Sequence, residues 1–215
     1  MRTPLTVISV NVQTALRLLK RINDDLKDPD TEKLLINAQR EIMRLSRMVG
    51  GMLTLSSISE NMEKSKIDMA TILLSTADTL LLLLSKRGNE IKVEAGEGLF
   101  VFGDADLLSQ VASNLIQNAH AHTENDVIRL HAVRDGGKIA VTVSDNGSGI
   151  PPELMPRLFE RGVADGSGTG YGLFLCKTVV ESHGGEIWIE SEMGGGTVVS
   201  FTIPVSQGQF GGDGE

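Results

Sequence analysis

The sequence lacks three things: a second cysteine, a long apolar run and an excess of basic residues. A lone Cys176 excludes an intramolecular disulfide and suits a reducing compartment. Because Cys176 lies in an apolar helical run, we expect it to be a small buried core residue. The longest apolar stretch, TILLSTADTLLLLL, is interrupted by polar residues and is shorter than the ~18 residues of a membrane span. It therefore predicts a helix buried in a core.

The charge balance is acidic. The chain has 20 Lys and Arg against 28 Asp and Glu, a formal net charge of -8 at pH 7. Binding to nucleic acid is driven by clustered Lys and Arg, so the composition argues against a nucleic-acid partner. The 215 residues, 40% of them hydrophobic, are enough for one full core plus a smaller element.

The first part of the chain, residues 1–55, has apolar residues at helical spacing. They predict one helix over 1–27 and a second over about 31–53, separated by Pro29, which disfavours helix before it. A short connection makes the two helices an antiparallel hairpin. A lone hairpin leaves apolar stripes uncovered, so we expect a second copy of the chain to cover them in a homodimer.

The rest of the chain divides into a polar linker at 56–66, a second domain at 67–205 and a disordered tail at 206–215. Helices are expected at about 69–86, 104–122 and 171–183, with a short one after the two prolines at 151–152. Strands are expected near 90–95, 99–102, 127–133, 138–144, 186–191 and 197–203. The segment RDGGK joins two of these strands as a hairpin. Hairpins mixed with helices predict an α+β sandwich with helices on one face of a mixed sheet.

The segment SDNGSGI directly follows a predicted strand. Gly147 and Gly149 allow a sharp turn and a close approach of the backbone to a ligand. The carboxylate of Asp145 can accept hydrogen bonds from an amino group on a flat ring. A simple Asx turn is the alternative interpretation.

A second glycine-rich segment, GSGTGYGLFLCK, leads into a helix. Gly168, Gly170 and Gly172 leave free N–H groups at the positive end of the helix dipole, which favours phosphate binding. The spacing is not that of a P-loop. The glycine-rich stretch before this segment is typical of a mobile lid.

Two asparagines, Asn114 and Asn118, lie four residues apart in SNLIQNAHAH and share a helix face. An amide oxygen is a suitable ligand for Mg²⁺. The alternative is that both amides bond only to solvent or to neighbouring backbone.

Five motifs occur in order: NLIQNA, DNGSGI, LFERG, GTGYGL and GGGTVVSF. Together they resemble the catalytic ATP-binding domain of bacterial sensor histidine kinases, in the superfamily that includes gyrase, Hsp90 and MutL. RTPLT and the hairpin resemble the dimerisation and phosphotransfer domain of the same kinases. The resemblance implies half of a dimeric four-helix bundle followed by an α/β sandwich with a mixed sheet.

The resemblance also implies a protein-histidine kinase with ATP and Mg²⁺ as cofactors. Asp145 would accept from the adenine amino group, and Asn118, supported by Asn114, would be catalytic by holding Mg²⁺. Arg161 would neutralise phosphate charge from the lid, although an exposed surface role is the alternative. The residues that would contact the nucleotide are Asn114, Asn118, Asp145, Gly147, Gly149, Ile150, Phe159, Arg161, Gly168, Thr169, Gly170, Tyr171, Gly172, Leu173 and Thr197.

In the family the phosphoacceptor motif is His-Glu-x-Arg-Thr-Pro, and here Met1 occupies the x. The resemblance therefore implies that the acceptor histidine lies just before Met1 and that this fragment does not phosphorylate itself. No histidine of the chain has that context, so we expect structural or solvent-facing roles for all four: His120, His122, His131 and His183. In the family, a residue at the position of Thr3 orients the water that removes phosphate from the response regulator. The alternative is that Thr3 simply caps the helix before Pro4.

The partner implied is the receiver domain of a response regulator, which accepts the phosphoryl group on an aspartate. The fragment would be cytoplasmic, and segments outside it would anchor a longer sensor in the bacterial membrane. Ala121 stands where the family usually has Lys, and the lid lacks arginines after Arg161. Two other functions stay open: a non-catalytic, ATP-responsive dimeric scaffold, and a serine kinase of the anti-sigma type, against which the helical hairpin argues.

Overall fold

The computed structural model describes residues 51, 58, 62–84, 88–163 and 170–205. The chain divides into two compact units, Met1–Thr54 and Leu55–Glu215. The predicted hairpin (apart from Gly51), residues 56, 57 and 59–61 of the predicted linker and the predicted tail lie outside the described residues. The architecture below is that of the second unit.

The second unit contains a five-stranded mixed sheet with the strand order β2-β4-β5-β7-β6. The strands, listed in that order, are β2 (Glu90–Ala95), β4 (Val127–Asp135), β5 (Lys138–Asp145), β7 (Gly196–Pro204) and β6 (Glu186–Glu192). β2 and β4 are parallel, and the other neighbours are antiparallel. The last paired residues of β4 and β5 are Asp135 and Lys138, so the predicted hairpin at RDGGK is confirmed, with Gly136 at φ +57° in its turn.

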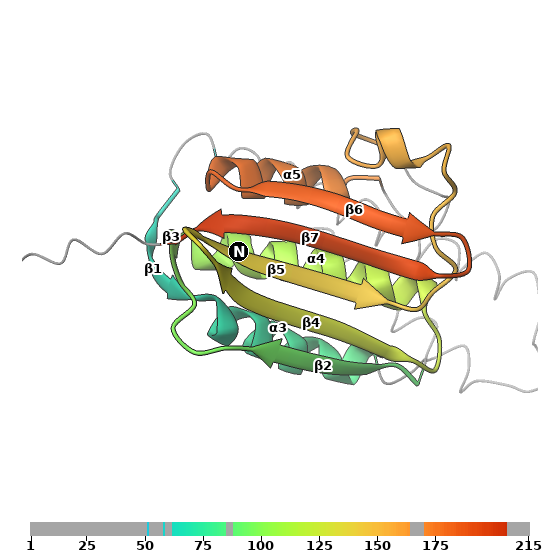
Figure 1. Cartoon of the computed structure of the whole chain (residues 1–215), viewed down its shortest axis with the longest axis horizontal. Helices are drawn as coiled ribbons and strands as arrows, with labels where there is room; N and C mark the ends of the chain where they lie inside the picture. Colours follow the sequence, from blue (N-terminus) through green and yellow to red (C-terminus); the bar gives the residue numbers. More distant parts are fainter. Residues whose placement is uncertain (1–50, 52–57, 59–61, 85–87, 164–169, 206–215) are drawn as a thin grey trace, which may run out of the picture. The chain divides into compact units, whose positions relative to one another are not determined.

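Three helices cover one face of this sheet, as Figure 1 shows. They are α3 (Met69–Leu84), α4 (Ala105–His122) and α5 (Gly172–Ser182), and a short 3₁₀ helix (Met155–Arg157) follows the two prolines. The predicted α+β class, with helices on one face of a mixed sheet, is confirmed. The other face of the sheet carries the alternate, more exposed residues of each strand.

α4 is the central helix and packs against both α3 and α5. Asp104 caps its first turn by accepting from the backbone N–H groups of Asp106 and Leu107. Its apolar residues recur at helical spacing and are buried: Leu107, Leu108, Val111, Ala112, Leu115, Ile116 and Ala119. This stripe forms the middle of the core between the helices and the sheet.

A small second sheet is the main difference from the sequence-based expectation. β1 (Ser65–Asp68) pairs antiparallel with β3 (Phe100–Gly103). The predicted linker included Ser65 and Lys66, and that part of the prediction is wrong. A four-residue strand with a single buried residue, Ile67, has too little periodicity to be recognised. Its pairing partner lies more than 30 residues further along the chain.

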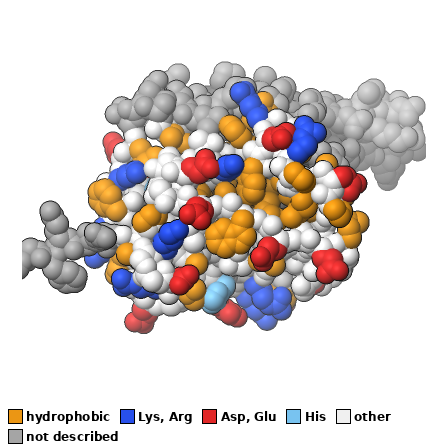
Figure 2. Space-filling model, turned by 45° about the horizontal axis from the view of Figure 1, so that its top comes forward, with side chains coloured by type: hydrophobic (Ala, Val, Ile, Leu, Met, Phe, Trp, Pro, Cys, Tyr) orange, Lys and Arg blue, Asp and Glu red, His pale blue; other side chains and the backbone are white. Residues whose placement is uncertain are grey.

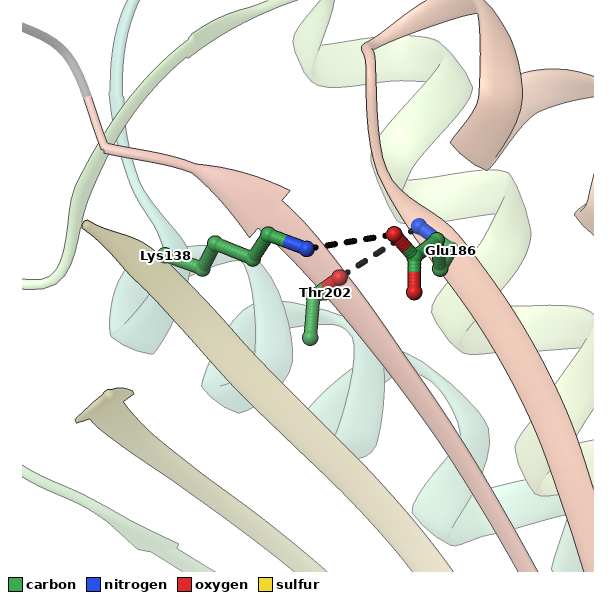
Figure 3. A network of polar contacts seen from close by, with 3 residues as sticks. All are labelled: Lys138, Glu186 and Thr202. Carbon is green, nitrogen blue, oxygen red and sulfur yellow. Dashed lines mark hydrogen bonds and ion pairs between the residues drawn. The ribbon is translucent and has the colours of Figure 1, made fainter. Parts of the chain in front are cut away.

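The open face of the sheet carries side chains of both charges together with exposed hydrophobic residues such as Trp188 and Val133. In Figure 2, acidic and basic side chains are interspersed with hydrophobic ones over the visible part of the described surface. Figure 3 shows one polar contact across three strands, where Lys138 Nζ lies 3.2 Å from Glu186 Oε1 and the backbone N–H of Glu186 donates to Thr202 Oγ1. Both charged side chains of this pair are largely exposed, so the pair contributes little to stability.

His183 joins the end of α5 to the start of α4. Its Nε2 accepts from the backbone N–H of Asp104 at 3.0 Å, and its Nδ1 lies 2.8 Å from the carbonyl oxygen of Val179. Nδ1 must therefore carry the proton and Nε2 must be unprotonated. A side chain at Gly103 would collide with the imidazole ring. The prediction of a structural role for His183 agrees with these contacts.

Burial, reinforced by the charge of Lys64, lowers the pKa of His183 below its usual value of 6.5. The unfolded chain therefore takes up a proton at this site more readily than the folded protein does, and the stability that His183 contributes is lost as the pH falls below about 6.5. We expect the free energy of unfolding in urea to rise with pH through this range. His183→Ala should cost about 1–3 kcal/mol and should flatten this part of the profile. His131→Ala, at an exposed position on β4, is the control, and an unchanged profile in the His183 variant would contradict the assignment.

Candidate nucleotide-binding site

The two predicted asparagines lie on the side of α4 that faces α5. The side chain of Asn114 contacts the thiol of Cys176. Asn118 Oδ1 lies 3.9 Å from the point where a Cβ on Gly172 would stand. Asn118 is therefore placed at the N-terminus of α5, as the phosphate-site interpretation requires. Cys176 is fully buried, and burial raises the pKa of its thiol to about 12, which agrees with a core role.

The N-terminus of α5 has no side-chain cap among the described residues. Tyr171 is the N-cap residue and makes no capping hydrogen bond with its side chain, and the first intrahelical bond runs from Leu175 N–H to the Tyr171 carbonyl. The N–H groups of Gly172 and Leu173 lie ahead of that bond. Such groups, at the positive end of the helix dipole, can bind an anion.

Gly170 approaches this helix end in the left-handed conformation, with φ +69°. A Cβ there would collide with the backbone of Gly162 and Val163, and the N–H of Gly162 donates to the Gly170 carbonyl at 3.0 Å. The predicted contacts at Gly168 and Thr169 lie outside the described residues.

The predicted lid residues reach the same helix end. Arg161 Nε donates to the hydroxyl of Tyr171 at 3.2 Å, and the guanidinium group lies 5.2 Å from the centre of the Tyr171 ring. Phe159 is half-buried, with Lys177 Nζ of α5 5.8 Å from its ring centre. Leu173 packs against the core. The structure thus brings Arg161 to the N-terminus of α5 while it stays exposed.

Asp145 ends β5 with its carboxylate buried; the residue is 8% exposed. Burial raises the pKa of Asp145, and hydrogen bonds from the backbone N–H groups of Gly147 and Thr197 partly offset this rise. The bond from Gly147 N–H, 2.8 Å to Oδ1, is an Asx-turn contact, so the alternative interpretation of this segment is also realised. Two backbone donors do not use up the acceptor capacity of a carboxylate.

Close backbone contacts explain the glycines beside Asp145. A side chain at Gly147 would collide with the carbonyl of His122, at the end of α4. Gly149 has φ +70°, and a Cβ there would collide with the carbonyl of Glu192, at the end of β6. The loop after β5 is therefore packed between α4 and the β6–β7 turn.

Ser191 orders this end of the site and was not predicted. Its hydroxyl donates to the Gly196 carbonyl at 2.8 Å and accepts from the N–H of Ile150 at 3.0 Å. Its oxygen also lies 2.9 Å from Thr197 Oγ1. Because the Ser191 hydroxyl already donates its one hydrogen to the Gly196 carbonyl, Thr197 must be the donor in that pair. A lone serine in an alternating strand carries no signal that could have revealed this role.

Thr123 is the second residue that sequence reasoning missed. Its hydroxyl oxygen is the one buried side-chain oxygen or nitrogen of the described residues that has no hydrogen-bond partner. The hydroxyl nevertheless lies beside the Asp145 carboxylate and lowers its pKa. It is therefore near the carboxylate without making a well-formed direct bond. A buried hydroxyl in this position has the capacity to bond to a ligand or an ordered water.

These features fit a nucleotide. A buried acceptor, an unpaired hydroxyl and close-approach glycines suit a flat ring with an amino group, and the uncapped α5 N-terminus suits phosphates. Within the described part of the chain, no three His, Cys, Asp or Glu side chains gather to hold a metal. A divalent ion here would rely on Asn118 Oδ1 and on oxygens of the ligand.

The histidines add no separate site. Asn89 Nδ2 lies 2.8 Å from His120 Nδ1, His131 is exposed on β4, and His183 joins two helices. Among the described helices, none is both long and apolar enough to cross a membrane.

Two family models match the chain. The model described as "Histidine kinase-, DNA gyrase B-, and HSP90-like ATPase" matches residues 103–207, which contain the site above. The model described as "His Kinase A (phospho-acceptor) domain" matches residues 1–61.

Individual relatives agree with this. The chain is 30% identical over 224 residues to the sensor histidine kinase TrcS of Mycobacterium tuberculosis, covering 98% of this chain and 43% of TrcS. It is 32% identical over 225 residues to the adaptive-response sensory kinase SasA of Crocosphaera subtropica, covering 95% of this chain and 56% of SasA. The chain thus spans only about half the length of these curated relatives.

Solved structures show the same relationship. The catalytic domain of the histidine kinase ThkA is 31% identical with a TM-score of 0.61, over 66% of this chain and 96% of that domain. ThkA in complex with the response regulator protein TrrA matches with 27% identity and a TM-score of 0.66, over 93% of this chain and 59% of ThkA. By its two matched domains and these relatives, the chain belongs to the two-component sensor histidine kinases.

Proposed function

We propose that this chain binds Mg-ATP at the site formed by α4, α5 and the loop after β5, and that it phosphorylates a histidine of a phosphoacceptor helix. The observation that carries the proposal is the buried Asp145 carboxylate with spare acceptor capacity between close-approach glycines. The match of residues 103–207 to an ATPase family supports it.

Different residues of the site bind the base and the phosphates of ATP. Asp145 accepts from the adenine amino group, and Gly147 and Gly149 let the backbone lie against the base. The N–H groups at the start of α5 hold phosphate oxygens, with Arg161 adding positive charge from the lid. Asn118 presents its amide oxygen beside that helix end, where Mg²⁺ would bind.

Bound Mg-ATP would supply the γ-phosphoryl group and a cation that balances its charge. The protein's share of such a reaction is mostly positioning and charge stabilisation. Asn118 and the N-terminus of α5 would hold the phosphate chain of the nucleotide in place. The lid, which meets α5 through Arg161 and Tyr171, keeps water away from the transfer.

We propose that residues 1–55 form the dimerisation and phosphotransfer hairpin, with the linker, catalytic domain and tail following, and that the kinase works in the cytoplasm. The phospho-acceptor match over residues 1–61 supports this role. The phosphoryl group then passes to an aspartate of a response regulator receiver domain. Thr3 orients the water for the reverse, phosphatase reaction. The complex of ThkA with TrrA supports a regulator as partner, and nothing in the site favours a non-catalytic scaffold.

Asp145→Asn should abolish most adenine recognition. Its amide nitrogen would turn a donor toward the adenine amino group or toward the N–H groups of Gly147 and Thr197, a mismatch of about 1–3 kcal/mol. Isothermal titration calorimetry with ATP measures the loss, and thermal denaturation verifies that the variant is folded. Asp135→Asn, at the tip of the β4–β5 hairpin, is the matched control. Equal ATP affinity in a folded Asp145→Asn protein would refute the assignment.

Asn118→Ala should weaken the part of ATP binding that depends on Mg²⁺ while leaving adenosine binding largely unchanged. The amide oxygen lies at the phosphate end of the site, away from the base. Titrations with ATP in the presence of Mg²⁺ and of EDTA, and with adenosine, separate the two effects. Gln117→Ala, at an exposed position of the same helix, is the control. An equal loss of adenosine and Mg-ATP binding would argue for a purely structural role.

The chain should form a homodimer through residues 1–55 at concentrations of tens of micromolar, typical of moderate affinity. A glutamate in the predicted apolar stripe, Ile42→Glu, should shift the protein towards monomer because it would bury an unpaired charge. Arg44→Glu, on the predicted opposite face, should not. Sedimentation equilibrium decides, and a wild-type monomer at these concentrations would contradict the prediction.

A further inference from the structure

Thr123 is held firmly where α4 ends. Its backbone is extended, with φ -121° and ψ 145°, and its carbonyl accepts from Asn89 Nδ2 at 2.8 Å. Asn89 is itself buried, at 5% exposed, and its Oδ1 accepts from the N–H of Asp126 at 3.3 Å. One side chain just before β2 thus holds the loop between α4 and β4 at two points. The Thr123 side chain therefore has little freedom to turn towards solvent.

The Thr123 hydroxyl has an unused proton beside a buried carboxylate. Thr123 is 3% exposed, its oxygen has no hydrogen-bond partner, and it lies next to Asp145. Two further hydroxyls at this end of the site already donate elsewhere: Ser191 to the Gly196 carbonyl and Thr197 to Ser191 Oγ. Leaving a buried hydroxyl unpaired costs free energy. We therefore expect the Thr123 hydroxyl to donate a hydrogen bond when the protein is in its functional state.

We propose that Thr123 is a positioning residue for the nucleotide base: its hydroxyl donates to the Asp145 carboxylate, directly or through one ordered water, and so keeps that carboxylate ionised and turned towards the base. With Gly147 and Thr197 giving backbone N–H groups, Thr123 becomes the third donor. An ionised carboxylate has about four acceptor positions, which leaves one for the adenine amino group. This inference rests on the proposed ATP-binding function.

The proposal has a consequence for pH. Burial raises the pKa of Asp145, and the donors around it act in the opposite direction. Four groups face the carboxylate: the charge of His122 at the end of α4, the hydroxyl of Thr123 just after α4, the N–H of Gly147 from its own loop and the N–H of Thr197 from β7. Removing the Thr123 donor should raise the pKa of Asp145 further. Protonation weakens the carboxyl group as an acceptor and adds a donor that opposes the amino group, so nucleotide binding should then fail at a higher pH than in the wild type.

Thr123→Val removes the hydroxyl and keeps the shape, whereas Thr123→Ser keeps the hydroxyl. ADP binding would be measured by calorimetry from pH 5 to 8, at each pH where circular dichroism shows a folded protein. We expect Thr123→Val to bind about tenfold more weakly near neutral pH, with its loss of binding on acidification displaced to higher pH. Thr123→Ser should stay close to wild type. Thr142→Val, on the open face of the sheet, is the matched control.

The Asp145 carboxyl group would also be titrated by ¹³C NMR in nucleotide-free wild-type, Thr123→Val and Thr123→Ser proteins, and again with His122→Gln in each background. A higher apparent pKa in Thr123→Val alone, with either residue at 122, supports the proposal. Two results would overturn the proposal. One is a Thr123→Val protein with the wild-type pKa of Asp145 and the wild-type affinity for ADP, and the other is an equal loss of ADP affinity in the Val and Ser variants. Absence of ADP binding by the wild type together with a shifted NMR titration would instead contradict the proposed function and leave the Thr123–Asp145 bond standing.

Discussion

The packing of α4 between α3, α5 and the sheet is the constraint on which the rest of the second unit depends. Its buried apolar stripe fixes how the helix is rotated, and that rotation turns Asn114 and Asn118 towards α5. Its length fixes where Thr123 and the carbonyl of His122 meet the loop after β5. One hydrophobic contact surface therefore positions both the phosphate end and the base end of the proposed site.

The end of the proposed site that would bind the base depends on a buried charge, the Asp145 carboxylate. Taking the Asp145 carboxylate out of water is unfavourable, and burial accordingly raises its pKa. Backbone N–H groups from its own loop and from β7, together with the Thr123 hydroxyl, act against that rise. In the proposed site, the same donors would also orient the remaining acceptor position towards the base, so that recognition and stability would depend on the same contacts.

The loops around this carboxylate are shaped by backbone contacts. The loop after β5 and the β6–β7 turn pack against each other through Gly149 and Gly196, and Gly194 N–H donates to the Ser148 carbonyl at 2.8 Å. Side chains at these glycines would force the two turns apart. This part of the proposed site is therefore shaped by main chain and depends little on side-chain rotamers.

Much of this protein is determined by the sequence itself, since helical periodicity, strand alternation, glycine-rich turns and the order of five motifs are local signals. They placed α3, α4, α5 and the hairpin at Gly136, and they identified Asp145 and Asn118 as candidates. The β1–β3 pair, the His183 contact with Asp104, the Ser191 bonds and the unpaired Thr123 hydroxyl were decided only by the tertiary structure. The β1–β3 pair, the His183 contact, the Ser191 bond to Ile150 and the Thr123–Asp145 approach each join residues some 20 to 80 positions apart. A single hydroxyl or imidazole also has no periodicity. Its role exists only when folding removes water and brings its partner within reach.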